Sequence, residues 1–367
     1  MKVLHIANIP SPYRVDYFNK LGKLCDLTVV FERADSSERD KSWKKNEFIN
    51  FKGVICKGKK IGVDAAFSVE PIKYINRNRD GWIIIGNALS FTGALEILYM
   101  KRKKIAYWIE GDGAFPGNEK VGGIKYRVKK YLISGADGYL STCLNHDKYY
   151  IKYGADKNKI FRYPFTSISE ENIIKKVMSN EDKMIIREKL GMKEEHIIIS
   201  VGQYIYRKGF DILIEASKRL GKEIGVYIIG GKDYRIMVNE PQIHEIPFKV
   251  TTELVEYYRA ADIFVLPTRE DIWGLVINEA MANGLPVLTT NRCNAGLQLI
   301  KNGENGYIVP VDNVEAMVDR IKRLLFSDNL EKMGNESLKT IREYTIEKMA
   351  QSHIDIYESR QNVVVNG

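Results

Sequence analysis

Two carboxylates with a glycine between them are the residues whose spacing in this 367-residue chain points to chemistry. Asp271 ends a short polar loop, Gly274 stands at the expected start of a helix, and Glu279 lies further along that helix. Ionised carboxylates only accept hydrogen bonds, so they suit sugar and ribose hydroxyls, which donate. A helix start offers unpaired N–H groups to a phosphate, and glycine allows close approach to the backbone. The pattern predicts a phosphate site between two hydroxyl-binding acids, as a nucleotide-sugar requires.

A strand, loop, helix and strand are expected to position these residues. An apolar strand at 263–266 precedes the loop, and a second apolar strand at 287–288 follows the helix. The loop at the carboxyl end of the first strand would then face a ligand crevice. An ordinary strand–helix unit with a solvated acidic loop is the alternative explanation.

A basic pair, Arg207 and Lys208, occupies a second junction of this kind, after the apolar strand 197–202. A departing nucleoside diphosphate gains negative charge, so a fixed guanidinium and ammonium would bind the transition state better than the ground state. An Arg–Lys pair on an ordinary surface is the alternative.

The stretch 267–290 continues through 278–282 and 284–287 in a pattern that closely resembles the signature of retaining family 4 glycosyltransferases. The resemblance covers nearly the whole chain and is strongest from 200 to 310. It implies an α/β protein with the GT-B fold, in which two Rossmann-like, doubly wound domains face a central cleft. Asp271 stands where the family usually has glutamate. Gln203 stands where it usually has arginine, so we expect Arg207 to supply that charge beside Lys208, which matches the family lysine.

The resemblance also assigns roles to residues of the second half. Lys208 and Arg207 would neutralise the leaving diphosphate, Asp271 would orient the sugar, and Glu279 would hold the ribose. Other contacts with the nucleotide-sugar are expected from Gly274, Leu275, Val276, Gln203, Glu270 and, near the base, Ile246.

In the first half, short apolar strands at 3–7, 27–31, 82–85, 105–109 and 138–141 alternate with helices such as 17–24 and 94–101. This rhythm predicts a doubly wound, mostly parallel sheet. Two prolines follow the first strand where a dinucleotide fold would carry its glycine motif, which argues against a nicotinamide or flavin cofactor. The resemblance places this loop on the acceptor side, with Tyr13 and Arg14 meeting acceptor or phosphate; a proline-stiffened turn is the alternative.

Glu110 follows the strand 105–109, and we expect it to contact donor or acceptor hydroxyls and to take part in catalysis. Its spacing to Asp112 is similar to the metal-binding pair of the other large glycosyltransferase fold. We expect no metal here, because the stronger motif belongs to a fold that uses side chains instead of the ion. Asp112 itself is expected in a solvated turn.

Charge is unevenly spread along the chain. Residues 1–165 carry 30 Lys and Arg against 17 Asp and Glu, whereas the whole chain carries 56 against 47. Such asymmetry favours an anionic partner, and we expect a phosphorylated or lipid-linked acceptor or an anionic membrane surface rather than nucleic acid. A solvated basic surface with no specific role is the alternative.

Two segments are candidates for membrane contact: 43–49, and a helix at 122–134 with Ile124, Val128, Tyr131 and Leu132 on one face. Packing of that stripe against its own domain is the alternative. With no signal peptide or membrane-spanning stretch in the sequence, we expect a cytoplasmic protein, at most peripheral on the inner face of the membrane.

These observations predict a first domain at 1–165, completed by a crossing helix at 345–367, and a second at 166–344. The expected activity is metal-independent, cofactor-free, retaining transfer of a hexose-type sugar from a nucleotide-sugar, most often a UDP-sugar, to an acceptor hydroxyl. The acceptor would be a sugar or a lipid-linked oligosaccharide of capsule, O-antigen, exopolysaccharide or glycolipid synthesis. A nucleotide-sugar 2-epimerase, a glycosyl phosphorylase and a non-catalytic sugar-nucleotide or nucleic-acid binding protein are the alternatives.

Overall fold

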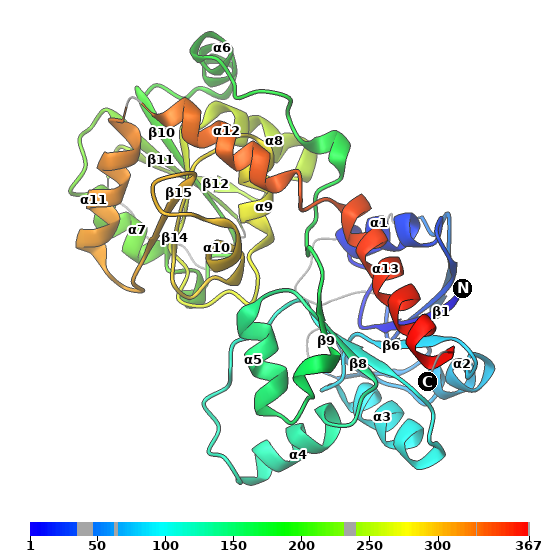
Figure 1. Ribbon diagram of the computed structural model, residues 1–367. Coiled ribbons are helices and arrows are strands. Elements are labelled where there is room, and N and C mark those ends of the chain that lie inside the picture. The colour runs from blue at the N-terminus through cyan, green and yellow to red at the C-terminus, as the bar shows by residue number, and fades with distance from the viewer. Residues whose placement is uncertain (35–46, 62–64, 231–239, 328, 366–367) are drawn as a thin grey trace. The chain divides into compact units, whose positions relative to one another are not determined.

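The computed structural model describes residues 1–34, 47–61, 65–230, 240–327 and 329–365. The chain packs into two units (Figure 1). Unit 1 comprises Met1–Ser167 with Thr345–Gly367, and unit 2 comprises Ile168–Tyr344. The expected membrane segment 43–49 lies partly outside the described residues, since 43–46 are not among them.

Unit 1 is built on a seven-stranded parallel sheet in the described chain, with strand order β3-β2-β1-β6-β7-β8-β9. The strands are β1 (Lys2–Ala7), β2 (Asp26–Phe31), β3 (Lys52–Ile55), β6 (Trp82–Ile85), β7 (Trp108–Glu110), β8 (Gly138–Ser141) and β9 (Ile160–Arg162). A short antiparallel hairpin, β4 (Lys59–Ile61) and β5 (Ala65–Phe67), stands apart from this sheet. The strand order reverses between β1 and β6, so the loops after these two strands flank the ligand crevice expected of such sheets.

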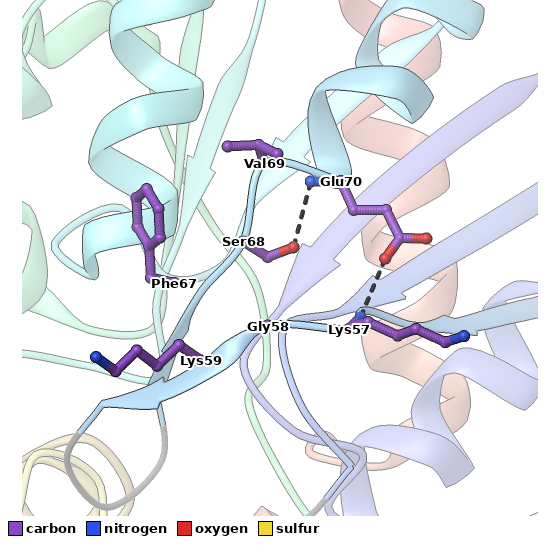
Figure 2. Close-up of a pocket in the computed structure, with 7 residues that line it drawn as sticks. All are labelled: Lys57, Gly58, Lys59, Phe67, Ser68, Val69 and Glu70. Atoms are coloured by element: carbon purple, nitrogen blue, oxygen red, sulfur yellow. Dashed lines mark hydrogen bonds between the residues drawn. The ribbon is translucent and has the colours of Figure 1, made fainter.

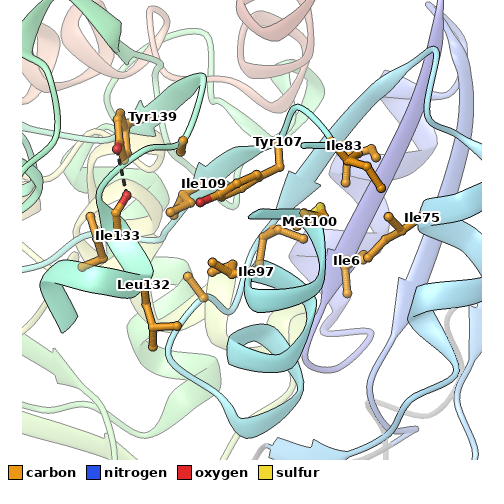
Figure 3. Packing of buried hydrophobic residues seen from close by; sticks show 14 of the residues in the cluster. Ile6, Ile75, Ile83, Ile97, Met100, Tyr107, Ile109, Leu132, Ile133 and Tyr139 are labelled. Atoms are coloured by element: carbon orange, nitrogen blue, oxygen red, sulfur yellow. Dashed lines mark hydrogen bonds between the residues drawn. The ribbon is translucent and has the colours of Figure 1, made fainter. Parts of the chain in front are cut away.

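The helices of unit 1 form two groups. Helices α1 (Pro12–Leu21) and α13 (Ile346–Val365) pack together, and α3 (Phe91–Lys103) packs with both α2 (Pro71–Arg77) and α4 (Ile124–Ile133). Helix α5 (Leu144–Lys152) packs beside β8. Figure 3 shows how Ile97 and Met100 of α3 meet strand residues such as Ile83 and Ile109 in the core. Burying a strand on both faces requires an almost continuous apolar run, which is what the sequence of β6 supplies.

Unit 2 repeats the architecture with a six-stranded parallel sheet in its described part, ordered β12-β11-β10-β13-β14-β15. Its strands are β10 (His196–Val201), β11 (Ile224–Gly230), β12 (Ile243–Pro247), β13 (Ile263–Leu266), β14 (Val287–Thr290) and β15 (Gly306–Val309). Its helices are α6 (Asn180–Leu190), α7 (Phe210–Ser217), α8 (Thr251–Ala260), α9 (Leu275–Ala282), α10 (Asn294–Leu299), α11 (Val314–Leu325) and α12 (Leu330–Ile341). The order reverses between β10 and β13, and the predicted site loops follow these two strands.

The expected α/β class with two Rossmann-like sheets is confirmed, but several element boundaries in unit 1 differ from prediction, and two of them bear on the site residues. Helix α1 begins at Pro12 rather than 17, because proline fits the first helical position, where no N–H partner is needed. Tyr13 and Arg14 therefore belong to the first turn of α1, not to a loop. Strand β7 begins at Trp108 rather than 105, since the Ile105 N–H bonds to the Met100 carbonyl and closes the end of α3.

Among the described residues, no helix combines the length and the apolar character needed to cross a membrane.

Candidate functional site

The loop between β13 and α9 is fixed by hydrogen bonds to two neighbouring loops. The Thr268 hydroxyl donates to the carbonyl of Arg207 at 3.0 Å, which ties the loop to the segment after β10. On the other side, the Asp271 N–H donates to the carbonyl of Arg292 at 2.8 Å, and the Asn294 N–H donates to that of Asp271 at 3.2 Å. Asp271 is thus held by backbone bonds to the segment after β14, and Thr268 ties the same loop to the segment after β10.

Gly274 caps the start of α9 in a conformation that only glycine adopts easily. Its φ is +104°, and a Cβ built on it would lie 2.7 Å from the Sγ of Cys293. Burial, followed by the charge of Asp271, raises the pKa of Cys293 to about 12, so its thiol stays neutral under the glycine. The N–H groups of Leu275 and Val276 lie in the first turn, where an α-helix supplies no acceptor of its own. The helix start is therefore shaped as an anion site.

A buried hydrogen bond fixes the direction of that first turn. The indole N–H of Trp273 donates to the side-chain oxygen of Asn278 at 2.9 Å, and both side chains are buried. Neither was predicted as a site residue. The available signals were a tryptophan directly before Gly274 and an amide inside an apolar helix.

Lys208 and Asp271 form an ion pair at the point where the two loops meet. The Lys208 Nζ lies 2.6 Å from the Asp271 Oδ2, and the two side chains are 12% and 10% exposed. Lys208 is held there by the 3-10 helix η4 (Tyr206–Lys208) and by Gly209, where a Cβ would lie only 2.1 Å from the Pro267 carbonyl oxygen. A fixed ammonium group beside the tip of α9 is the result.

Arg207 lies on the more exposed side of the same pair. Its Nη1 donates to the Glu270 carbonyl at 2.6 Å and lies 3.9 Å from the Asp271 Oδ2. The side chain of Glu270 forms an ion pair with Arg292, a residue that the sequence interpretation did not include. The structure thus brings together Arg207, Lys208, Glu270 and Asp271 next to Gly274.

The other predicted donor contacts are more dispersed. Glu279 is half-buried on α9 and accepts a hydrogen bond from the Tyr258 hydroxyl of α8 at 3.0 Å. Burial, and then the charge of Glu279, raises the pKa of Tyr258 well above its usual range, so the phenol remains a donor. Gln203 is exposed after β10, and Ile246 is half-buried on the edge strand β12. In the described chain, neither is joined to Lys208 or Asp271 by a hydrogen bond or ion pair.

A second charged cluster lies within unit 1, around Glu110 at the end of β7. The Arg14 Nη1 donates to the Glu110 Oε1 at 2.6 Å, and the His5 Nε2 lies 2.7 Å from the Oε2. The Tyr163 hydroxyl donates to the Oε1 at 3.1 Å, and the His353 Nε2 of α13 is 3.8 Å from the Oε2. Burial alone would raise the pKa of Glu110, but Arg14 and then His5 hold it well below its usual range.

This geometry corrects the expectation that Glu110 contacts substrate hydroxyls. Its side chain is 0% exposed and its oxygens are taken up by protein donors. The solvent-facing member is Asp112, whose side chain is 32% exposed. It is not a free solvated turn residue as expected, because Arg14 forms an ion pair with it and the Tyr13 hydroxyl donates to it at 2.8 Å.

The sequence interpretation did not identify His5, Tyr163 and His353 as members of this cluster. A histidine inside the apolar strand β1 and another on the apolar face of α13 were the only local signals. Their shared partner lies far away in the sequence, so pattern alone does not pair them.

A shallow hollow of about 450 Å³ also lies in unit 1, beside the hairpin β4–β5 (Figure 2). Its lining includes Lys57, Lys59, Phe67, Ser68 and Glu70, and none of the predicted site residues. Among the described residues, no group of three or more His, Cys, Asp or Glu side chains is arranged to hold a metal ion.

Gly274→Ala is expected to destabilise unit 2 by about 2–4 kcal/mol, because it adds left-handed strain and an overpacked contact with Cys293. Urea unfolding measures the change. Gly191→Ala is the matched control, since Gly191 has a φ of +70° with no atom within 4 Å of a built Cβ. Gly191→Ala should lower the free energy of unfolding by about 1 kcal/mol, from backbone strain alone. Equal losses in both variants, or no relief when Cys293→Ala is added to Gly274→Ala, would contradict the crowding beneath the glycine.

Comparison with known proteins shows which family the second half of the chain resembles. Residues 182–345 match the model described as glycosyl transferases group 1. An uncharacterized glycosyltransferase of Haemophilus influenzae is 29% identical over 283 residues, which cover 74% of this chain and 74% of that protein. The capsular polysaccharide biosynthesis glycosyltransferase CapM of Staphylococcus aureus is 27% identical over 163 residues, 41% of this chain and 42% of CapM.

Solved structures share the fold over almost the whole chain. Sucrose-phosphate synthase from Thermosynechococcus elongatus has a TM-score of 0.74 at 15% identity, covering 99% of this chain and 100% of that one. Anabaena HepE, solved in complex with UDP, has a TM-score of 0.76 at 14% identity, covering 98% and 100%. Residues 182–345 thus match the group 1 glycosyltransferase family, and the chain as a whole shares the GT-B fold of these structures.

Proposed function

We propose that the protein transfers a sugar from a nucleotide-sugar, with UDP as the nucleotide, to an acceptor hydroxyl with retention of the anomeric configuration. The observation that carries the proposal is the ion pair of Lys208 and Asp271 beside the Gly274 start of α9. It lies after the two central strands β10 and β13, where the strand order reverses and where open α/β sheets bind ligands.

The charges at this place suit a diphosphate. Lys208 and Arg207 supply two positive groups, and the first turn of α9 adds N–H donors and roughly half a positive charge. Carboxylates at Asp271 and Glu279 are acceptors for the hydroxyls of the sugar and the ribose. UDP is the choice that the resemblance implies, and Anabaena HepE, a protein of the same fold, was solved with UDP and with UDP-glucose.

In the proposed reaction, the bond between the anomeric carbon and the β-phosphate oxygen breaks, and its electron pair remains on the diphosphate. The acceptor oxygen bonds to the same carbon from the same face, and its proton passes to the departing diphosphate oxygen. Lys208 and Arg207 stabilise the charge that develops there, so the proposal requires no metal ion. Asp271 keeps the Lys208 ammonium in place before the donor arrives, which removes a reorganisation cost from the reaction.

The acceptor is proposed to be a sugar or a lipid-linked oligosaccharide. Support comes from relatives such as CapM and the Campylobacter jejuni N,N'-diacetylbacillosaminyl-diphospho-undecaprenol alpha-1,3-N-acetylgalactosaminyltransferase, which is 20% identical over 292 residues. In unit 1, Arg14 and Tyr13 are both bonded to Asp112, so we propose that they act on the acceptor side by presenting that carboxylate.

Slow hydrolysis of a panel of nucleotide-sugars, which requires no acceptor, tests the donor assignment. One UDP-sugar should be hydrolysed, in EDTA as well as without it. Glu279→Ala should weaken binding of that donor about 10- to 100-fold, through loss of hydrogen bonds to the ribose. Glu256→Ala, on the neighbouring helix α8 with a partly exposed side chain, should leave binding unchanged.

Three outcomes would overturn this proposal. Release of an epimerised sugar without acceptor would identify a 2-epimerase. Donor binding with no turnover under any condition would identify a binding protein. Equal donor affinity in wild type and Glu279→Ala would remove Glu279 from the site.

A further inference from the structure

Helix α4 in unit 1 turns large apolar side chains toward solvent. Ile124, Val128 and Tyr131 are 83%, 53% and 54% exposed. Their spacing places them on one face of the helix, because a helix returns to the same side after three or four residues. Leu132 and Ile133 are buried and attach the helix to the core. Packing of the whole apolar stripe against its own domain is therefore contradicted for three of its four members.

Basic residues border this apolar stripe on both sides. Positions 120–134 contain five Lys or Arg and no Asp or Glu. At about 100° per residue, Lys125 lies on one flank of the stripe, and Arg127 and Lys130 lie on the other; all three are exposed. Of the other two bases, Lys120 is exposed before the helix begins, and Lys129 is half-buried and paired with Glu119.

The end of the neighbouring helix α3 extends the positive surface. The Lys101 Nζ donates to the Ser134 carbonyl at 2.8 Å and also to the Tyr131 carbonyl, which joins the last turn of α3 to the end of α4. Figure 1 shows α3 and α4 in unit 1. Arg102, Lys103 and Lys104 follow it and are exposed. An apolar ridge thus lies within a field of positive charge formed by two helices.

We propose that this surface docks on an anionic lipid membrane, with Ile124, Val128 and Tyr131 entering the headgroup region. We call it the α4 face, defined by these three residues with Lys125, Arg127 and Lys130. Apolar side chains gain free energy at the boundary between headgroups and acyl chains, while long basic side chains reach the lipid phosphates from beside them. A nucleic acid would use the positive charge but would leave the two aliphatic side chains without a partner, so the pattern favours lipid.

Sedimentation of the full chain with vesicles tests this proposal independently of any sugar transfer. Vesicles of phosphatidylcholine with about 30% phosphatidylglycerol should bind the protein, and pure phosphatidylcholine should bind it at least tenfold more weakly. Ile124→Ser with Val128→Ser should lower binding to the anionic vesicles at least tenfold. Lys125→Glu with Arg127→Glu should lower it to a similar extent and should also flatten its dependence on salt.

A matched control comes from unit 2, where Met184 and Ile185 on α6 are 67% and 68% exposed. Met184→Ser with Ile185→Ser removes similar apolar surface and should leave vesicle binding unchanged. Circular dichroism and donor hydrolysis should be unaffected in all these variants, because none lies in the proposed donor site. The proposal fails if wild type does not sediment with anionic vesicles at low salt. It also fails if the Ile124→Ser, Val128→Ser variant binds vesicles as wild type does. A third contradicting result is binding of a single-stranded oligonucleotide in place of the vesicles, with the same dependence on Lys125 and Arg127.

Discussion

Lys208→Met is expected to lower turnover about 100- to 1,000-fold while changing donor affinity much less. Methionine keeps most of the length and apolar volume of the lysine stem but removes the positive charge that opposes the developing charge on the diphosphate. Because this charge interaction grows as the bond to the sugar breaks, the loss falls on kcat more than on KM. Initial rates measure the change in turnover. They are taken, with and without acceptor, using the nucleotide-sugar that the hydrolysis panel identifies as the donor.

Lys218→Met provides the comparison for this variant. Lys218 also pairs with a carboxylate of unit 2, Glu215, but both side chains are 46% exposed. Its removal should change turnover less than twofold, as expected for an exposed ion pair. Wild-type turnover in Lys208→Met would show that the ammonium group plays no part in the chemistry.

Glu110→Ala is expected to destabilise unit 1 by about 3–5 kcal/mol, the second large effect. It leaves Arg14 without its fully buried partner and takes the acceptor from His5 and Tyr163. Hydrogen exchange of amides in β1 and β7 measures the loss. Glu347→Ala, which removes a partly exposed pair with Lys20 between α1 and α13, should cost less than about 1 kcal/mol. Similar losses in the two variants would mean that the cluster contributes no more than a surface pair.

The same cluster predicts how stability depends on pH. The pKa of Glu110 is held well below its usual range in the folded chain by Arg14 and His5, against the effect of burial. The contribution of Glu110 to the free energy of unfolding is therefore complete above its unfolded pKa of about 4.3. It is lost as the pH falls through the pKa of Glu110 in the folded chain. Burial lowers the pKa of His146 to about 3 and also lowers that of His353. The unfolded chain then takes up more protons, so stability should begin to fall below about pH 6.5.

The arrangement of loops at the proposed donor site could be predicted from the sequence, because it follows from strand order. Lys208 and Asp271 lie 63 residues apart, yet each comes shortly after an apolar parallel strand. Parallel strands end at one edge of a sheet, so their following loops converge when the strands are neighbours, as β10 and β13 are. The sequence did not reveal that Asp271 pairs with Lys208, because that contact depends on the exact path of two loops.

The contacts of Glu110 in unit 1 and the exposure of the α4 face could not be predicted from sequence patterns. Glu110 and His5 are 105 residues apart, and no local rule relates a carboxylate at the end of β7 to a histidine in β1, two strands away in the sheet. Apolar residues spaced four and three positions apart, such as Ile124, Val128 and Tyr131, form the same pattern whether that side of the helix faces the core or the solvent. Only the packing of α4, through Leu132 and Ile133, decides between the two.

A crystal structure of the protein soaked with UDP tests most directly whether unit 2 binds a nucleoside diphosphate where β10 and β13 end. The diphosphate oxygens should lie within hydrogen-bonding distance of the Lys208 Nζ and of the N–H groups of Leu275 and Val276, with the ribose hydroxyls at Glu279. Ordered UDP bound elsewhere, with Lys208 still paired only to Asp271, would contradict the account.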